Sequence, residues 1–462
     1  MSMKKYYLGI DIGTSSVKLV AIDKSGDHFS SKCTYDTPGI ENYCLALRSA
    51  LEMLGRELPL EQVSAIGLSS QVGTYLTDSG ETIPWFSNAG EAELAEVKSI
   101  CSDEEFMSEI GMCHPDLISY PLPRLLYVKR NFPDATSVIM PKEAIIRELT
   151  GRLVTDTFSQ RGICDPQTNR YSEKLLKKLG IDLKLPDIVS PTDIAGFITP
   201  DAAKRYSLPI GTPVYTGCND FYAGLLGMGV VKEGTFFELS GTSEHIGVIT
   251  SELVRGNLIS GKYFSGYATY GGTKASGVAC DFAINNFGIG NLDENTVIHK
   301  QPIFLPYMRG ERAPVFDENA KGVFFGITDE TTKDDMAYSV LEGVVFSLYH
   351  ISKALPLNTA GQIITGGGST ADRLMMKLKA SLFGCDIVHA EQNESSAVGA
   401  AMIAMVGSKE FDDFDAAASA VIRYDSIMKP DPLVRDRLLG RFEIYEKLYP
   451  CLKEQFDEFS KI

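Results

Sequence analysis

The chain lacks the features that define several large protein classes. Its nine cysteines are scattered and form no C-x-x-C, so the sequence predicts reduced thiols rather than a disulfide framework or a zinc site. No apolar run approaches the roughly 20 residues of a membrane helix. The apolar stretch near the N-terminus is too short for the core of a signal peptide. The expected location is therefore the cytoplasm.

Bases and the common nucleotide motifs are also scarce. The 60 acids outnumber the 44 bases and leave a formal net charge of −16, so the surface repels nucleic-acid backbones. No G-x-x-x-x-G-K-[ST] is present, which excludes a Walker-type nucleotide site. No G-x-G-x-x-G follows the first predicted strand, which disfavours a Rossmann dehydrogenase. The length of 462 residues favours two or more domains.

What the sequence does contain is one short turn that occurs twice between strand-like segments. The two copies are Gly13-Thr14-Ser15 and Gly241-Thr242-Ser243. Superposing them aligns strand with strand on both sides and places Asp11 opposite Leu239. The repeat indicates either a duplicated domain with diverged halves or the chance recurrence of a common turn. In each copy, backbone N–H groups and hydroxyls are suited to bind phosphate oxygens, and Lys18 adds positive charge to the first; ordinary hairpin turns are the alternative.

Two acids stand where strands end. Asp11 precedes the first turn, and through Mg²⁺ a carboxylate there can hold phosphates. Asp220 follows the strand expected over 211–217 and opens a helix of small residues. It can cap that helix or act as the general base that accepts a proton from a substrate hydroxyl during phosphoryl transfer. Position alone does not separate these roles, and one residue can serve both.

The second half ends in two glycine-rich or small-residue segments. A strand over 361–365 leads into three glycines, and Ser369 or Thr370 is expected to cap the helix that follows, with Gly384 beyond its end. A second small-residue helix opens over 394–401. Bare backbone at the three glycines suits a flat ligand, and a tight strand–helix turn is the simpler interpretation.

Taken together, six segments in chain order resemble the FGGY carbohydrate kinases of the actin-like ATPase superfamily, in particular xylulokinase-like and gluconokinase-like members. The segments are residues 9–18, 216–227, 239–243, 304–314, 322–327, and 366–369 together with 394–401. The resemblance implies an α/β fold of two ribonuclease-H-like domains, each a mixed sheet flanked by helices, with an interdomain cleft. The N-terminal domain would cover 1–228, the C-terminal domain 229–440, and a terminal helix over 441–462 would pack back on the first domain.

The resemblance also implies an activity and a set of site residues. ATP, with Mg²⁺, would phosphorylate a hydroxyl of a small ketose, sugar acid or polyol, and the only partners expected are that sugar, ATP and a second copy in a homodimer. Asp220 would be the catalytic base, in contact with sugar and metal, and Asp11 would bind the metal. The phosphate-binding set is Gly13, Thr14, Ser15, Lys18, Gly241, Thr242 and Ser243. The adenosine-binding set is Gly366, Gly367, Gly368, Ser369 and Ser396. The sugar-binding set is Gln71, Trp85, Asn88 and Asp220.

The sugar side departs from the family pattern. Where the family carries Trp-x-Asp-x-Arg, this chain has Ser87 and Ala89 after Trp85, so a carboxylate–guanidinium pair is missing. Gln71 is followed by Val-Gly-Thr in place of Met-His-Gly. These changes weigh against xylulose and leave the sugar unidentified. His245, after the second turn, is either a further sugar contact or a structural residue.

Two other classes are weighed against the kinase. One is an actin-like or chaperone-like ATPase, and the other is a sugar-sensing protein that has lost catalysis. The chaperone would need a further peptide-binding domain, and the sensor commonly carries a DNA-binding helix-turn-helix, which the acidic charge disfavours. The presence of both Asp11 and Asp220 favours an active enzyme.

Overall fold

The computed structural model describes residues 4–113, 117–241, 244–274, 276–289, 292–296, 301–357, 361–367, 372–391 and 394–462. The chain forms two compact units. The first consists of Met1–Val231, Gly261–Phe264 and Gln392–Ile422, and the second of Lys232–Ser260, Ser265–Glu391 and Arg423–Ile462. The first break lies near the predicted boundary at 228, but a late segment of the chain returns to the first unit, which the sequence prediction did not include.

The first unit is built on a mixed sheet whose strands run in the order β12-β13-β4-β1-β2-β3, with β14 paired to β4. The strands are β1 (Tyr6–Ile12), β2 (Ser16–Ile22), β3 (His28–Thr34), β4 (Val63–Ser70), β12 (Ile194–Phe197), β13 (Pro213–Tyr215) and β14 (Cys218–Asn219). β1 pairs antiparallel with β2 and parallel with β4. The predicted strands around the first turn are confirmed.

Helices cover both faces of this sheet near β1. Because side chains alternate along a strand, Leu8 and Ile10 of β1 point to one face, where they join a buried cluster with Tyr43 and Leu47 of α1 (Ile40–Leu54). The opposite face contacts α12 (Ser395–Gly407). Every residue of β1 is consequently buried.

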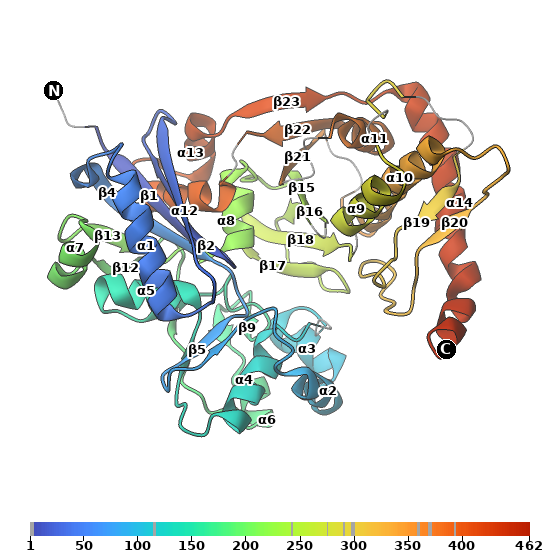
Figure 1. The fold of residues 1–462 in the computed structure, drawn as a ribbon. Helices are drawn as coiled ribbons and strands as arrows, with labels where there is room; N and C mark the ends of the chain where they lie inside the picture. The colour runs from blue at the N-terminus through green and yellow to red at the C-terminus, as the bar shows by residue number, and fades with distance from the viewer. Residues whose placement is uncertain are drawn as a thin grey trace. The chain divides into compact units, whose positions relative to one another are not determined.

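The approach of α12 to the sheet is a backbone contact. A Cβ atom on Gly9 would lie 1.8 Å from the carbonyl oxygen of Ala397, and one on Gly67 would lie 1.9 Å from that of Ala400. No side chain fits in either place, so the strands carry glycine where the helix carries alanine. Figure 1 shows the result: the orange helix α12 lies beside the blue strand β1, although the two come from distant parts of the chain.

The remaining elements of the first unit are helices and short strands. The helices are α2 (Glu91–Ile100), α3 (Asp103–Ile110), α4 (Pro121–Asn131), α5 (Pro141–Thr150), α6 (Glu173–Lys178), α7 (Pro200–Tyr206), α8 (Asp220–Gly227), α13 (Phe414–Val421) and the 3₁₀ turn η1 (Leu60–Gln62). The short strands are β5 (Tyr75–Thr77), β6 (Thr82–Ile83), β7 (Val138–Ile139), β8 (Val154–Asp156), β9 (Cys164–Asp165), β10 (Arg170–Tyr171) and β11 (Asp187–Val189).

The second unit repeats the strand arrangement of the first. Its sheet runs in the order β17-β18-β16-β15-β21-β22-β23. The strands are β15 (Phe236–Ser240), β16 (His245–Thr250), β17 (Ile259–Tyr263, whose residues from Gly261 on are grouped with the first unit), β18 (Gly266–Gly272), β21 (Gln362–Gly367), β22 (Asp386–Ala390) and β23 (Tyr424–Met428). As β1 does, β15 pairs antiparallel with the next strand and parallel with a later one. The shared order supports a duplicated domain over a chance recurrence of the turn.

The terminal helix α14 (Pro432–Phe459) belongs to the second unit, whereas the sequence prediction placed its last part on the first domain. Its buried Phe442 and Tyr445 pack against Phe346 of α10 (Lys333–Ser352). Leu382 of α11 (Arg373–Phe383) lies in the same core. The other elements of this unit are α9 (Ser276–Asn286), β19 (Ile303–Leu305) and β20 (Val323–Phe325).

Two predictions about helices can be checked directly. The helix after the three glycines is present with Gly384 at its end in the left-handed conformation, but its cap is Asp372, whose carboxylate accepts the N–H groups of Leu374 and Met375. The expectation that Ser369 or Thr370 caps it is therefore wrong, because Asp372 lies directly before the first helical residue. Within the described ranges, no helix is long and apolar enough to cross a bilayer.

Candidate active site

The turn between β1 and β2 has the geometry of a closed hairpin with an exposed tip. The N–H of Gly13 donates to the carbonyl of Ser16 at 2.9 Å. Tyr35, beyond β3, supports the turn: its hydroxyl donates to the carbonyl of Gly13, and its N–H donates to that of Ser15 at 3.0 Å. Thr14 and Ser15 are exposed. The predicted turn is confirmed, and its role in binding phosphate remains a prediction.

Asp11, at the end of β1, is a buried carboxylate next to a cation. It is 3% exposed, and the hydroxyl of Ser69 on β4 donates to its Oδ1 at 2.8 Å. Lys18 lies directly across on β2 and forms an ion pair with Glu394, with 2.8 Å between Nζ and Oε2. Burial raises the pKa of Asp11, and the charge of Lys18 opposes that rise. The role of Asp11 in holding Mg²⁺ remains a prediction.

Asp220 is the first residue of α8, and it does not cap that helix. The N-cap is Asn219, whose Oδ1 accepts the N–H of Tyr222 at 2.8 Å. The carboxylate of Asp220 instead accepts the N–H of Phe221, also at 2.8 Å. The capping role that the sequence allowed for Asp220 is therefore filled by its neighbour. The carboxylate of Asp220 is therefore not used to cap α8.

The surroundings of Asp220 make it a base suited to neutral pH. Burial and, to a lesser extent, the negative charge of Asp11 together raise its pKa to about 7, while the N–H of Phe221 and the charge of Lys18 act in the opposite direction. A general base is most effective when its pKa lies near the working pH. Strong perturbation by burial and a like charge is also typical of functional carboxylates. Local electrostatics thus single out this residue within the first unit.

The cap residue Asn219 connects α8 to an aromatic wall. Its Nδ2 donates to the carbonyl of Phe158 at 2.7 Å, and Tyr222 packs edge-on against Phe158, with 5.7 Å between ring centroids. Tyr263 contacts Tyr222 in the same way at 5.5 Å and donates its hydroxyl to the carbonyl of Val230. These ring contacts and the hydrogen bond of Asn219 fix the start of α8, where Asp220 lies.

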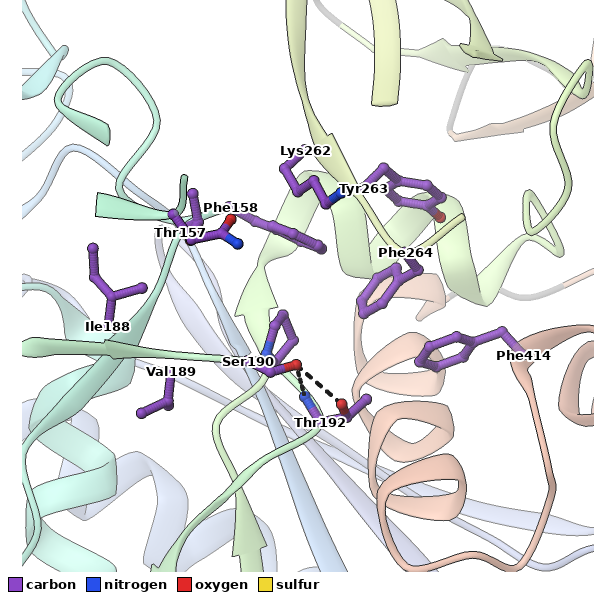
Figure 2. A pocket seen from close by; sticks show the side chains of 12 residues that line it. Thr157, Phe158, Ile188, Val189, Ser190, Thr192, Lys262, Tyr263, Phe264 and Phe414 are labelled. Atoms are coloured by element: carbon purple, nitrogen blue, oxygen red, sulfur yellow. Dashed lines mark hydrogen bonds between the residues drawn. The ribbon is translucent and has the colours of Figure 1, made fainter. Parts of the chain in front are cut away.

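The outer side of this wall borders a cavity of about 360 Å³ (Figure 2). Its aromatic lining is Phe158, Tyr263, Phe264 and Phe414. The rings of Phe264 and Phe414 contact each other at a tilt of 54°, with centroids 4.5 Å apart, and Ser190 and Thr192 close another side through the hydrogen bonds drawn in the figure. All of these residues belong to the first unit.

The predicted sugar-binding residues are connected to the first turn. The indole N–H of Trp85 donates to Oγ1 of Thr14 at 3.1 Å, and that hydroxyl donates to Oε1 of Gln71 at 3.3 Å. Gln71 is buried, and its Nε2 has no hydrogen-bond partner among the described residues. Trp85 is 41% exposed. Asn88 lies exposed on the same loop as Trp85. The structure thus brings Thr14, Gln71 and Trp85 together.

The sequence analysis did not predict three contacts of this site: Ser69 with Asp11, Asn219 as the cap of α8, and Glu394 with Lys18. The cap had a local signal, because asparagine is a strong N-cap residue directly before a small-residue helix. The other two contacts join residues far apart in the chain, for which no spacing rule exists.

In the second unit, the end of β15 and the end of β21 are neighbours. Ser240 pairs with Gly367, and Leu239 pairs with Gly366, in parallel register. The start of the second turn, at Gly241, and the first two glycines of the predicted adenosine segment therefore leave adjacent strands. The predicted residues Thr242, Ser243, Gly368 and Ser369 lie outside the described residues.

A buried ionic triad supports this edge of the second sheet. Nζ of Lys379 lies 3.1 Å from Oε1 of Glu238 and 2.9 Å from Oε1 of Glu244, and all three side chains are at most 3% exposed. Glu244 also accepts the hydroxyl of Ser240, so the residues on either side of the second turn are joined. The nearby cation lowers the pKa of Glu244 despite its burial, with Ser240 contributing in the same direction.

The last two predicted residues have defined surroundings. Ser396, expected at adenosine, belongs to the first unit, where its hydroxyl donates to the carbonyl of Asp220 at 2.9 Å. Its carbonyl accepts the hydroxyl of Ser69 at 3.3 Å. His245 begins β16, pairs with Gly272 and packs edge-on against Tyr270, with ring centroids 5.9 Å apart. Whether either residue contacts a ligand remains a prediction.

Comparison with family models gives matches to both halves. The N-terminal domain of the FGGY family of carbohydrate kinases matches residues 6–227, and the C-terminal domain of the same family matches residues 239–408. Together the two matches cover most of the chain.

Individual relatives agree with these matches. The chain is 27% identical to a xylulose kinase of Lactococcus lactis, over 99% of this chain and 97% of that protein. It is 26% identical to a gluconokinase of Bacillus subtilis, over 91% of each. The crystal structure of ligand-bound xylulose kinase from Lactobacillus acidophilus superposes with a TM-score of 0.89 at 25% identity, covering 98% of this chain and all of that one.

Proposed function

Because the chain belongs to the FGGY family of carbohydrate kinases, we propose that it transfers the terminal phosphoryl group of ATP to a hydroxyl of a small neutral sugar. The observation that carries the proposal is the state of Asp220. This carboxylate is relieved of capping by Asn219, and its pKa is raised to about 7 by burial and by Asp11. A protein without catalysis has no need of a base tuned in this way, and the family matches favour a sugar hydroxyl over water as the group that this base deprotonates.

In the proposed reaction, Asp220 accepts the proton of the attacking sugar hydroxyl as that oxygen bonds to phosphorus. Positioning and charge stabilisation supply most of the rate in phosphoryl transfer, so the base needs correct placement more than strength. The N–H of Phe221 donates to one carboxylate oxygen of Asp220 and so holds the side chain at the start of α8. The other oxygen is the one proposed to accept the proton. Thr14, Ser15 and Lys18 bind phosphate oxygens at the first turn. Gly241 begins the second turn, for which the same role is proposed.

Mg²⁺ fits the acids of this site. Burial and, second, the negative charge of Asp11 raise the pKa of Asp220, and Asp11 is itself buried with one oxygen held by Ser69. A divalent cation relieves such repulsion and takes one or two carboxylates with waters and phosphate oxygens. When bound, it would neutralise charge on the phosphates. Asp11 would hold the metal ion, and the negative charge of Asp220 would also attract it.

Neutral sugars are proposed ahead of sugar acids. The segment 71–90, which carries Gln71, Trp85 and Asn88, contains no lysine, arginine or histidine. Lys18, which lies across from Asp11 at the first turn, is assigned to the phosphates. What this side offers is an unpartnered amide N–H on Gln71, a half-exposed indole and an exposed amide on Asn88. These groups suit hydroxyls and the apolar face of a sugar ring better than a carboxylate.

A coupled ADP-release screen with Mg-ATP against ketopentoses, ketohexoses, polyols and aldonates tests the proposal. We expect at least one neutral sugar to give a kcat/KM at least tenfold above every aldonate. An aldonate as the best substrate would overturn the preference for neutral sugars, and no turnover with any member would overturn the kinase assignment. Size-exclusion chromatography with light scattering on the same preparation checks the predicted homodimer.

A further inference from the structure

Arg124 is a fully buried arginine in the first turn of α4, and among the described residues its hydrogen bonds go to one loop. Its side chain is 0% exposed. Nη1 donates to Oγ of Ser87 at 2.8 Å, and Nη2 donates to the carbonyls of Trp85 at 2.8 Å and of Ser87 at 2.9 Å. The guanidinium thus holds both ends of the Trp85–Ser87 tripeptide.

No acid balances this charge among the described residues. Arg124 forms no ion pair there, and its Nε is buried without a hydrogen-bond partner. Burial lowers the pKa of Arg124, and the groups that oppose this are the tyrosines Tyr75 and Tyr127 rather than a carboxylate. Burying an unpaired cation costs free energy. In exchange, Arg124 fixes the conformation of the loop, because a planar guanidinium can donate to two carbonyls and a hydroxyl in one fixed geometry.

The shape of the loop determines where the indole of Trp85 lies. The N–H of Trp85 donates to Oγ1 of Thr74 at 3.1 Å, so the residue is held from both of its backbone sides. Its side chain then reaches Thr14 of the first turn at 3.1 Å while 41% of the residue stays exposed. A contact thus runs from Arg124, through the backbone of Trp85, to the turn that is proposed to bind phosphate.

We propose that Arg124 is a positioning residue for sugar binding, because it holds Trp85 beside Thr14. It would organise this loop in place of the carboxylate–guanidinium pair that is missing at Ser87 and Ala89. It contacts neither sugar nor phosphate in this role. The inference rests on the proposed function for its kinetic part. The placement of Trp85 can be measured without any activity.

The test compares Arg124→Met, which keeps the length of the side chain, with Arg124→Lys, which keeps a charge and one or two donors. Trp85 is the only tryptophan of the chain, so intrinsic emission reports its environment directly. We expect Arg124→Met to shift that emission and to raise KM for the sugar at least tenfold while kcat falls less than threefold. Arg124→Lys should lie between Arg124→Met and the parent in both measurements.

A double-mutant cycle with Trp85→Phe separates positioning from a general structural effect. If Arg124 acts through Trp85, the double variant has a KM no more than twofold above that of the worse single variant. Multiplicative effects on KM, or unchanged emission in Arg124→Met, would overturn the proposal.

Ser87→Ala is the variant to use if Arg124→Met does not fold. It removes one of the three donated hydrogen bonds from a half-buried site and leaves Arg124 in place. We expect the same emission shift in reduced size and a two- to fivefold rise in sugar KM. If the parent phosphorylates no sugar, the kinase proposal fails, and the emission shift of Ser87→Ala still decides whether Arg124 positions Trp85: a shift supports it and no shift overturns it.

Discussion

The hydroxyl of Ser396, on α12, donates to the backbone carbonyl of Asp220, on α8, at 2.9 Å. The two helices cross at backbone distance, because a Cβ on Gly399 would lie 1.9 Å from the carbonyl oxygen of Ala223. Asp220, whose pKa is raised to about 7, is therefore supported by a helix that lies much later in the chain.

Replacing Asp220 by Asn removes the proposed base and keeps its shape. We expect sugar-dependent turnover to fall by about 10²–10⁴-fold, which is the range that general-base catalysis contributes. ATP binding, measured by calorimetry with a non-hydrolysable analogue, should change less than threefold. Substantial turnover in this variant would remove Asp220 from the role of base.

The same variant should be more stable than the parent at alkaline pH. The folded-state pKa of Asp220 is raised to about 7, so the folded protein binds this proton more tightly than the unfolded chain does. The unfolded chain ionises this carboxyl in the ordinary range, at about pH 4, whereas the folded protein does so only near pH 7, so the destabilisation builds up between these two values and is constant above them. The difference in melting temperature between Asp220→Asn and the parent should therefore be small at pH 5 and larger, a few degrees, at pH 8.5. An equal difference at both pH values would contradict the raised pKa.

The pH dependence of kcat/KM should show the same group in action. Because the base must be ionised, the parent should gain activity as the pH rises through about 7. Lys18 lowers the pKa of Asp220, so Lys18→Met should move the rise to higher pH, in addition to any loss of ATP affinity. Arg48→Met, at an exposed ion pair of α1, serves as the control and should leave the profile unchanged.

The contact of α12 with its neighbours tolerates no side chain at Gly399. Gly399→Ala places a methyl group on the backbone of Ala223, and we expect a loss of about 3–5 kcal/mol or failure to fold. Gly440, within α14, is exposed with nothing within 4 Å of an added Cβ. Gly440→Ala should therefore be neutral or stabilising by up to about 1 kcal/mol, since alanine is the better helix former. Equal effects of the two changes in urea unfolding would refute the close-contact explanation.

The buried triad in the second unit offers a test of charge balance. Lys379→Met leaves Glu238 and Glu244 together without their cation, and we expect a loss of about 3–5 kcal/mol. Adding Glu238→Gln and Glu244→Gln removes the two charges and should restore at least half of that loss. If the triple variant is no more stable than Lys379→Met, the effect is packing rather than charge.

Sequence patterns predicted the parts of this protein that depend on neighbours in the chain. The strands on both sides of Gly13 and the end of α11 at Gly384 follow from local spacing and composition. The recurring turn made a duplicated domain one of two interpretations, and the shared strand order of the two sheets favours it. These features were accessible because each is encoded within one or two turns or strands.

The remainder depends on pairs that the sequence does not mark. The sequence left Asp220 open as a helix cap or a general base, and the structure places Asn219 in the capping role. The apolar surroundings of Arg124 gave no sign that it would bind the loop at Ser87. The return of α12 to the first unit depends on glycines in two strands and alanines in a distant helix, a complementarity that only the folded chain reveals.

That return also determines when the protein can finish folding during synthesis. The ribosome releases β1 and β4 long before α12, and until α12 arrives the strip of sheet around Gly9 and Gly67 stays uncovered. The elements of the second unit between residues 232 and 391 emerge in the meantime. A nascent chain therefore carries an open sheet face through most of its translation, which favours chaperone attachment and makes late truncations far more damaging than their length suggests.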